Sequence, residues 1–63
     1  MDTLSLLAEF DRLALERIEQ LEEVGRGRDA KIMRSVYRTM GATGTRADFQ
    51  YWVKFLSKTA KVA

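Results

Sequence analysis

The chain has 63 residues, enough for one domain, and a domain of this size buries only about 60% of the surface that its unfolded chain exposes. It contains no cysteine and no histidine, which excludes disulfide bonds and the usual zinc ligands as sources of extra stability. Hydrophobic residues make up 46% of the chain, too many for an intrinsically disordered protein. We therefore expect one folded domain over residues 1–63, stabilised by close helix packing or by association with another subunit.

Charge is distributed unevenly along the chain, although the net charge is only +2. Residues 1–24 contain seven acidic and two basic side chains, a net charge of −5. Residues 25–63 contain nine basic and two acidic side chains, a net charge of +7. This asymmetry is the strongest functional signal in the sequence, because it indicates a charged surface that binds a partner of opposite sign.

The sequence predicts an all-α fold, because its β-branched residues are scattered and no segment is typical of a strand. We expect three helices, at about residues 3–24, 28–40 and 45–61. Asp2 or Thr3 is the expected N-cap of the first helix, and a glycine follows its end at the position that favours a left-handed backbone.

The first helix has more apolar surface than one neighbour can cover. Its apolar sector spans roughly 220° of the helix, against about 100° for an ordinary surface helix. We therefore expect a homodimeric helical bundle, or a complex with another protein, formed through this helix. The residues expected in the interface are Leu4, Leu7, Phe10, Ala14, Ile18 and Leu21.

Both later helices are predicted to carry a basic stripe opposite an apolar face. The second helix should end at Met40, with Gly41 in the left-handed position after it. The third should begin at a capping box made by Thr45 and Asp48, and it contains the only tryptophan and two of the three phenylalanines. At about 100° per residue, its tryptophan and both phenylalanines lie on one face and its lysines, including Lys61, on the other.

Catalysis is not expected from this sequence. Without histidine, cysteine or a glycine-rich phosphate loop, the residues that most enzymes use are missing. The glutamates of the first helix lie on its most polar face, where nothing desolvates them, and they lack the loop geometry that hard cations prefer. We expect a non-enzymatic protein with no cofactor and no metal site.

Binding of nucleic acid, DNA or RNA, by a small regulatory protein is the function that the basic stripes favour. Clustered lysines and arginines neutralise several phosphates together and release condensed counterions. We expect phosphate contacts from six basic residues, with Gln50 and Tyr51 as candidates for base contacts. The six are Lys31, Arg34, Arg38, Arg46, Lys54 and Lys58.

The alternative is a protein–protein interaction module, an adaptor or inhibitor that docks the apolar face of the first helix on a partner protein. In that case the acidic first helix complements the two basic helices, within a subunit or across a dimer. No stretch is apolar over the length that crosses a membrane, and the aromatic residues are needed for the core, so we expect no membrane partner. The lack of cysteine and of a secretory signal is compatible with a cytoplasmic location.

Overall fold

The structure is a computed structural model that describes residues 2–59. It contains three helices, α1 (Thr3–Glu23), α2 (Gly27–Thr43) and α3 (Arg46–Lys58), and no strand in the described part of the chain. The predicted all-α fold with three helices is therefore confirmed.

Helix α1 is bounded as its terminal residues predict. The side chain of Asp2 accepts a hydrogen bond of 2.7 Å from the backbone N–H of Ser5, which satisfies one of the free donors of the first turn. Beyond the other end, Gly25 has a φ of +80°, the left-handed conformation that glycine adopts without steric cost.

Helix α2 is longer than predicted. It was expected to end at Met40, but it continues through Gly41 to Thr43, and Gly41 has no positive φ. A glycine inside a helix costs only about 1 kcal/mol, so it weakens the helix without stopping it. The chain turns instead at Gly44, whose N–H donates to the carbonyl oxygen of Met40 at 2.9 Å. The linker to α3 is therefore shorter than the four residues that the sequence indicated.

The start of helix α3 confirms the predicted capping box. The hydroxyl of Thr45 accepts from the backbone N–H of Asp48 at 3.2 Å, and the Asp48 carboxylate accepts from the backbone N–H of Thr45 at 3.1 Å. The helix ends at Lys58, three residues before the predicted end. Position 61, the last of the predicted helix, lies outside the described residues.

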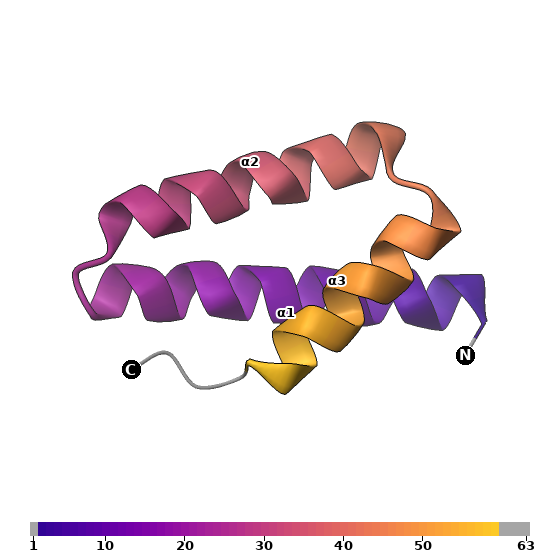
Figure 1. Ribbon diagram of the computed structural model, residues 1–63, viewed down its shortest axis with the longest axis horizontal. Helices are drawn as coiled ribbons and strands as arrows, with labels where there is room; N and C mark the ends of the chain where they lie inside the picture. Colours follow the sequence, from indigo (N-terminus) through magenta and orange to yellow (C-terminus); the bar gives the residue numbers. More distant parts are fainter. Residues whose placement is uncertain (1, 60–63) are drawn as a thin grey trace.

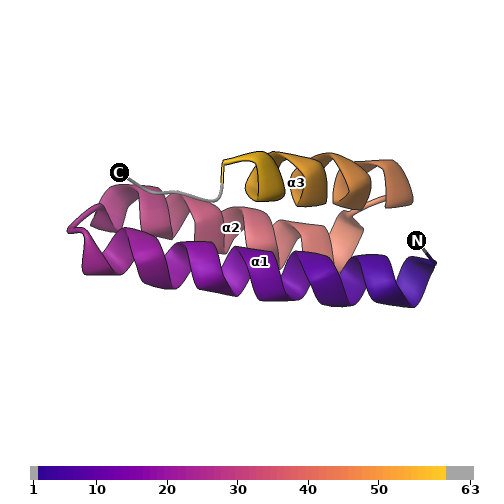
Figure 2. The same ribbon diagram turned by 90° about the horizontal axis from the view of Figure 1, so that it is seen from below.

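The helices form two layers (Figures 1 and 2). Helices α1 and α2 run antiparallel side by side and make one layer, and α3 crosses over α1 on one side of it. Helix α1 packs against both other helices, whereas α2 and α3 touch only weakly. The central element of the fold is therefore α1.

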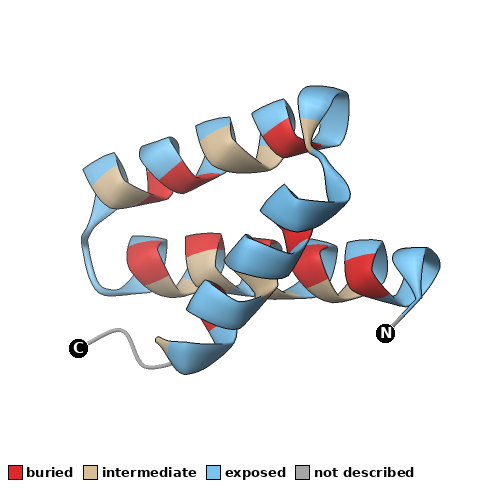
Figure 3. Ribbon diagram, turned by 45° about the vertical axis from the view of Figure 1, so that its right-hand side comes forward, coloured by how far each residue is buried: buried red, intermediate tan, exposed pale blue. Residues whose placement is uncertain are grey.

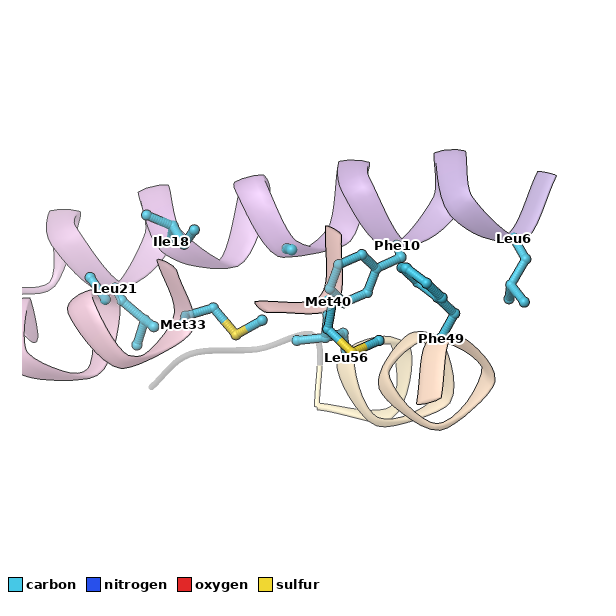
Figure 4. Packing of buried hydrophobic residues seen from close by; sticks show 10 residues of the cluster. Leu6, Phe10, Ile18, Leu21, Met33, Met40, Phe49 and Leu56 are labelled. Atoms are coloured by element: carbon cyan, nitrogen blue, oxygen red, sulfur yellow. The ribbon is translucent and has the colours of Figure 1, made fainter. Parts of the chain in front are cut away.

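The core lies along the inner side of α1, and the outer sides of all three helices are exposed (Figure 3). The Phe10 ring stacks on Tyr37 of α2, with ring centroids 6.1 Å apart, and meets Phe49 of α3 edge-on at 5.1 Å. Figure 4 shows how α1 contributes one side of this cluster and how α2 and α3 contribute the other. The buried core residues are Leu6, Phe10, Ala14, Ile18, Leu21, Ala30, Met33, Met40, Phe49 and Leu56.

Candidate interaction surfaces

The predicted interface on the first helix is largely the core of the subunit itself. Of its six residues, Phe10, Ala14, Ile18 and Leu21 are buried under α2 and α3, so they are not available to a partner in this fold. Only Leu4, 80% exposed, and Leu7, 37% exposed, remain on the surface. In this fold α2 and α3 together cover most of the broad apolar sector, including the other four residues.

The basic residues of α2 lie beside α1. Lys31, Arg34 and Arg38 are all exposed, as predicted, and Arg34 forms an ion pair with Glu22 of α1. Arg34 and Arg38 also border a hollow of about 430 Å³ between α1 and α2, which includes Leu15 and no residue of α3. This stripe therefore belongs to the α1–α2 layer.

The predicted nucleic-acid residues of α3 are exposed as well. Arg46 donates to the Thr3 hydroxyl at 2.6 Å, which connects the start of α3 to the start of α1. Gln50, Lys54 and Lys58 follow along the exposed side of α3. Tyr51 also belongs to an aromatic cluster on α3.

Tyr51 stacks on Phe55, with ring centroids 6.2 Å apart, and both rings meet Trp52 edge-on. Trp52 and Phe55 of this cluster lie on the side of α3 that faces α2, because both line a pocket together with Val36 of α2. Tyr51 itself is 60% exposed and does not line that pocket.

The two basic stripes do not merge into one surface. On α2, Arg34 and Arg38 are each two residues from Val36, about 160° around the helix from the side that faces α3. On α3, Lys54 is two residues from Trp52, and so about 160° from the side that faces α2. The facing sides of the two helices are apolar, and their basic sides point away from each other.

Between those facing sides lies an open groove, here called the α2–α3 groove, with a volume of about 580 Å³. Helices α2 and α3 diverge from their short linker, so no helix covers the space between them (Figure 1). Ile32 is 57% exposed and Phe55 is 40% exposed, although the sequence places both on apolar helix faces. The apolar residues that line the groove are Leu21, Ile32, Met33, Val36, Trp52 and Phe55.

Two arginines line the end of this groove that is farther from the α2–α3 linker. Arg17 of α1 lines it and donates hydrogen bonds to the backbone carbonyl oxygens of Leu56, at 3.2 Å, and of Thr59, at the end of α3. Arg26 also lines the groove and pairs with Asp29 at 2.6 Å. This end of the groove therefore has a net positive charge.

Arg17 was not identified from the sequence as a structural residue, although a signal was present. Seven residues separate it from Phe10, which places it only about 20° away on the helix, inside the apolar sector. A charged residue inside an apolar sector indicates a specific polar partner, here the partly buried carbonyl groups at the end of α3.

Among residues 2–59, three titratable groups have shifted pKa values, and each shift has a local cause. The hydrogen bond from the Ser5 backbone lowers the pKa of Asp2. The hydrogen bond that Tyr37 donates to Asp11 raises the pKa of Tyr37, and the hydrogen bond to Glu9 raises that of Arg12. All three are contacts at helix surfaces. Within residues 2–59, no three acidic side chains gather closely enough to hold a metal ion.

Comparison with protein families, with curated proteins and with solved structures gave no match. None of the three helices, over the described residues, has both the length and the apolar character that a membrane-spanning helix needs.

Proposed function

We propose that the protein is a non-enzymatic protein-interaction module that binds an amphipathic helix of another protein in the α2–α3 groove. The observation that carries this proposal is the exposure of Ile32 and Phe55 in a groove that also includes buried core residues, Leu21 and Met33. An exposed apolar groove between diverging helices is a common docking site for a helix. This proposal replaces the apolar face of α1 as the docking surface.

The charge around the groove indicates the chemistry of the partner. Arg17 and Arg26 line it, and among the described residues Asp29 is the only acidic one that does. Arg28 follows on α2 and Lys58 ends α3, both exposed. A helix with apolar residues at positions i, i+3, i+4 and i+7 and carboxylates beside them matches both the groove and its charge.

Trp52 is the only tryptophan and lines the groove, so its fluorescence reports on occupation directly. The probe is a synthetic helical peptide with leucines at i, i+3, i+4 and i+7 and glutamates on its flanks; the matched peptide carries lysines there. We expect the glutamate peptide to shift the Trp52 emission and to bind less tightly as salt is added. Equal binding of both peptides would contradict the charge argument, and binding of neither would contradict the proposal.

Variants of the groove test its location. Covering the exposed part of Ile32 or Phe55 contributes on the order of 1–2 kcal/mol to the binding free energy. Ile32→Ser and Phe55→Ser should therefore each weaken binding of the glutamate peptide about tenfold. Leu4→Ser is the control, because Leu4 is more exposed than either and is not among the groove residues. Its affinity should equal that of the wild type. A Leu4→Ser variant that binds as weakly as Phe55→Ser would place the site elsewhere.

Nucleic-acid binding through α3 alone is the second candidate. The observation in its favour is that Lys54 and Lys58 are exposed and have no acidic partner among the described residues. Together with Arg46 they provide up to three phosphate contacts per subunit. Three contacts predict a loss of affinity of about 40-fold between about 50 and 200 mM salt.

Fluorescence anisotropy of a labelled mixed-sequence duplex at those two salt concentrations measures this. Lys54→Glu combined with Lys58→Glu should abolish binding, whereas Lys31→Glu combined with Arg38→Glu, on the separate stripe of α2, should have a smaller effect. No binding by the wild type at the lower salt concentration would exclude this function. Equal losses in the two double variants would contradict the assignment to α3.

We also propose that the protein forms a homodimer. Leu4, Leu7 and Leu15 of α1 support this, because they remain exposed on an otherwise charged helix. Single exposed leucines are ordinary, but three on one helix of a chain this small are apolar surface that a second subunit covers.

A further inference from the structure

The α1–α2 layer has one face that α3 does not cover (Figure 2). On α1, Leu15 lies two residues from Arg17, which bonds the end of α3, and so about 160° away from it. On α2, Arg38 lies about 160° from the side that meets α3. We call this surface the hairpin face. Its exposed residues on α1 are Leu4, Ala8, Leu15, Glu19 and Glu22, and those on α2 are Lys31, Arg34, Arg38 and Ala42.

The side chains of the hairpin face are segregated by type both across the face and along it. Across its width, α1 contributes the acidic side chains and α2 the basic ones. Along its length, one end is apolar, with Leu4 and Ala8 beside Ala42, because α1 and α2 are antiparallel. The other end is charged, with Glu19 on α1 and Lys31 on α2.

We infer that the hairpin face binds the same face of a second copy of this chain, with the two-fold axis parallel to the helices. This inference rests on the proposed homodimer and adds its arrangement. With that axis, α1 of each copy lies on α2 of the other, so acidic residues meet basic ones twice. The apolar ends also meet each other.

The other way to place two such faces together is unfavourable. A two-fold axis perpendicular to the helices lays α1 antiparallel on α1 of the second copy. That arrangement lays the apolar end of each copy onto the charged end of the other, so the acidic residues of α1 lie on apolar surface of the other α1 and away from the basic residues of α2. Both divisions of the face therefore select the same axis.

The charged groups needed across this interface are available. Glu19, Lys31 and Arg38 have no ion-pair partner among the described residues, whereas Arg34 and Glu22 already pair within the subunit. The hollow of about 430 Å³ between α1 and α2 lies on the same face and includes Leu15. The second copy thus has both charges to pair with and apolar surface to cover.

Sedimentation equilibrium of the full chain over a range of concentrations tests the inference. The wild type should approach twice the mass of one chain. Glu19→Lys, and separately Lys31→Glu combined with Arg38→Glu, should each raise the dimer dissociation constant about tenfold or more, because the symmetry repeats every like-charge contact. An equal mixture of the two variants should regain the dimer, since the altered α1 then meets the altered α2.

The matched control is Lys54→Glu combined with Lys58→Glu, the same change of charge on α3, which should leave the dimer intact. Circular dichroism of each variant distinguishes loss of the dimer from loss of the fold, and Leu15→Ser, which changes no charge, gives a second test of the same face. A wild type that stays monomeric overturns the homodimer itself. A dimer that survives both charge variants, or variants that do not recover on mixing, overturns this arrangement and leaves self-association standing. Neither result bears on the α2–α3 groove.

Discussion

Helix α1 contacts α2 and α3 in two different ways. Its contact with α2 follows the length of both helices and carries polar links at the surface, Tyr37 to Asp11 and Arg34 to Glu22. Its contact with α3 is a shorter crossing that depends on a few large groups. The position of α3 is therefore more sensitive to single residues than the position of α2 is.

Phe10 takes part in both contacts, so its removal should have the largest effect. Phe10→Ala deletes the rings' contacts with Tyr37 and Phe49 together, and truncation of a buried phenylalanine costs about 3–5 kcal/mol. That is comparable with the whole stability of a small domain. We expect the variant to be largely unfolded in urea titrations followed by circular dichroism. Phe55→Ala is the matched control, since Phe55 is 40% exposed, and it should stay folded.

Arg17 takes part only in the contact with α3. Arg17→Met keeps the aliphatic part of the side chain and removes the hydrogen bonds to the end of α3. Loss of charge-assisted bonds to partly buried carbonyl groups costs about 1.5–3 kcal/mol. Arg12→Met, which removes only exposed ion pairs on α1, should cost less than Arg17→Met in the same urea titration. Equal losses would mean that Arg17 does not hold α3.

Two glycines near the end of α2 test where that helix turns toward α3. An added Cβ at Gly41 meets nothing, so Gly41→Ala should raise the free energy of unfolding by about 0.5–1 kcal/mol. At Gly44 the added Cβ would lie 2.6 Å from the carbonyl oxygen of Met40, so Gly44→Ala should lower it by about 1–3 kcal/mol. Had the helix ended at Met40, with Gly41 left-handed, Gly41→Ala would be destabilising. Whether Gly41→Ala raises or lowers the free energy of unfolding therefore decides whether α2 ends at Thr43 or at Met40.

Tyr37 takes part only in the contact with α2, and its effect should be the smallest. Its hydrogen bond to Asp11 raises the pKa of Tyr37 in the folded protein. The stabilisation that this hydrogen bond gives the folded state is complete below the pKa of the unfolded tyrosine, about 10. It is lost as the pH rises through the pKa of Tyr37 in the folded protein. The wild type should thus be more stable than Tyr37→Phe at pH 8, and the difference should shrink toward pH 11. If the stability difference between the wild type and Tyr37→Phe does not change with pH, the hydrogen bond to Asp11 does not stabilise the fold.

The features that could be predicted from the sequence are local ones. The capping box at Thr45 and the left-handed Gly25 depend on residues three or four positions apart, and both are found. Gly41 shows where local reasoning fails, because a glycine permits a helix to end without requiring it. The turn is at Gly44, where close approach to Met40 leaves no room for a side chain.

The interaction surfaces were less predictable, because they depend on which side of each helix its neighbours cover. The width of the apolar sector on α1 indicated two neighbours, but both turned out to come from the same chain. Ile32 and Phe55 look like core residues in the sequence, and they are exposed because α2 and α3 diverge.

By itself, the sequence determined the number of helices, most of their ends and the residues that share each face, because hydrogen bonds and helical periodicity act over a few residues. The tertiary structure decided that the basic stripes of α2 and α3 point apart, that a groove opens between these helices, and that Arg17 bonds the end of α3. These features depend on the angles at which the helices cross α1. Those angles are set by contacts such as that of Phe10 with Phe49, between residues far apart in the chain.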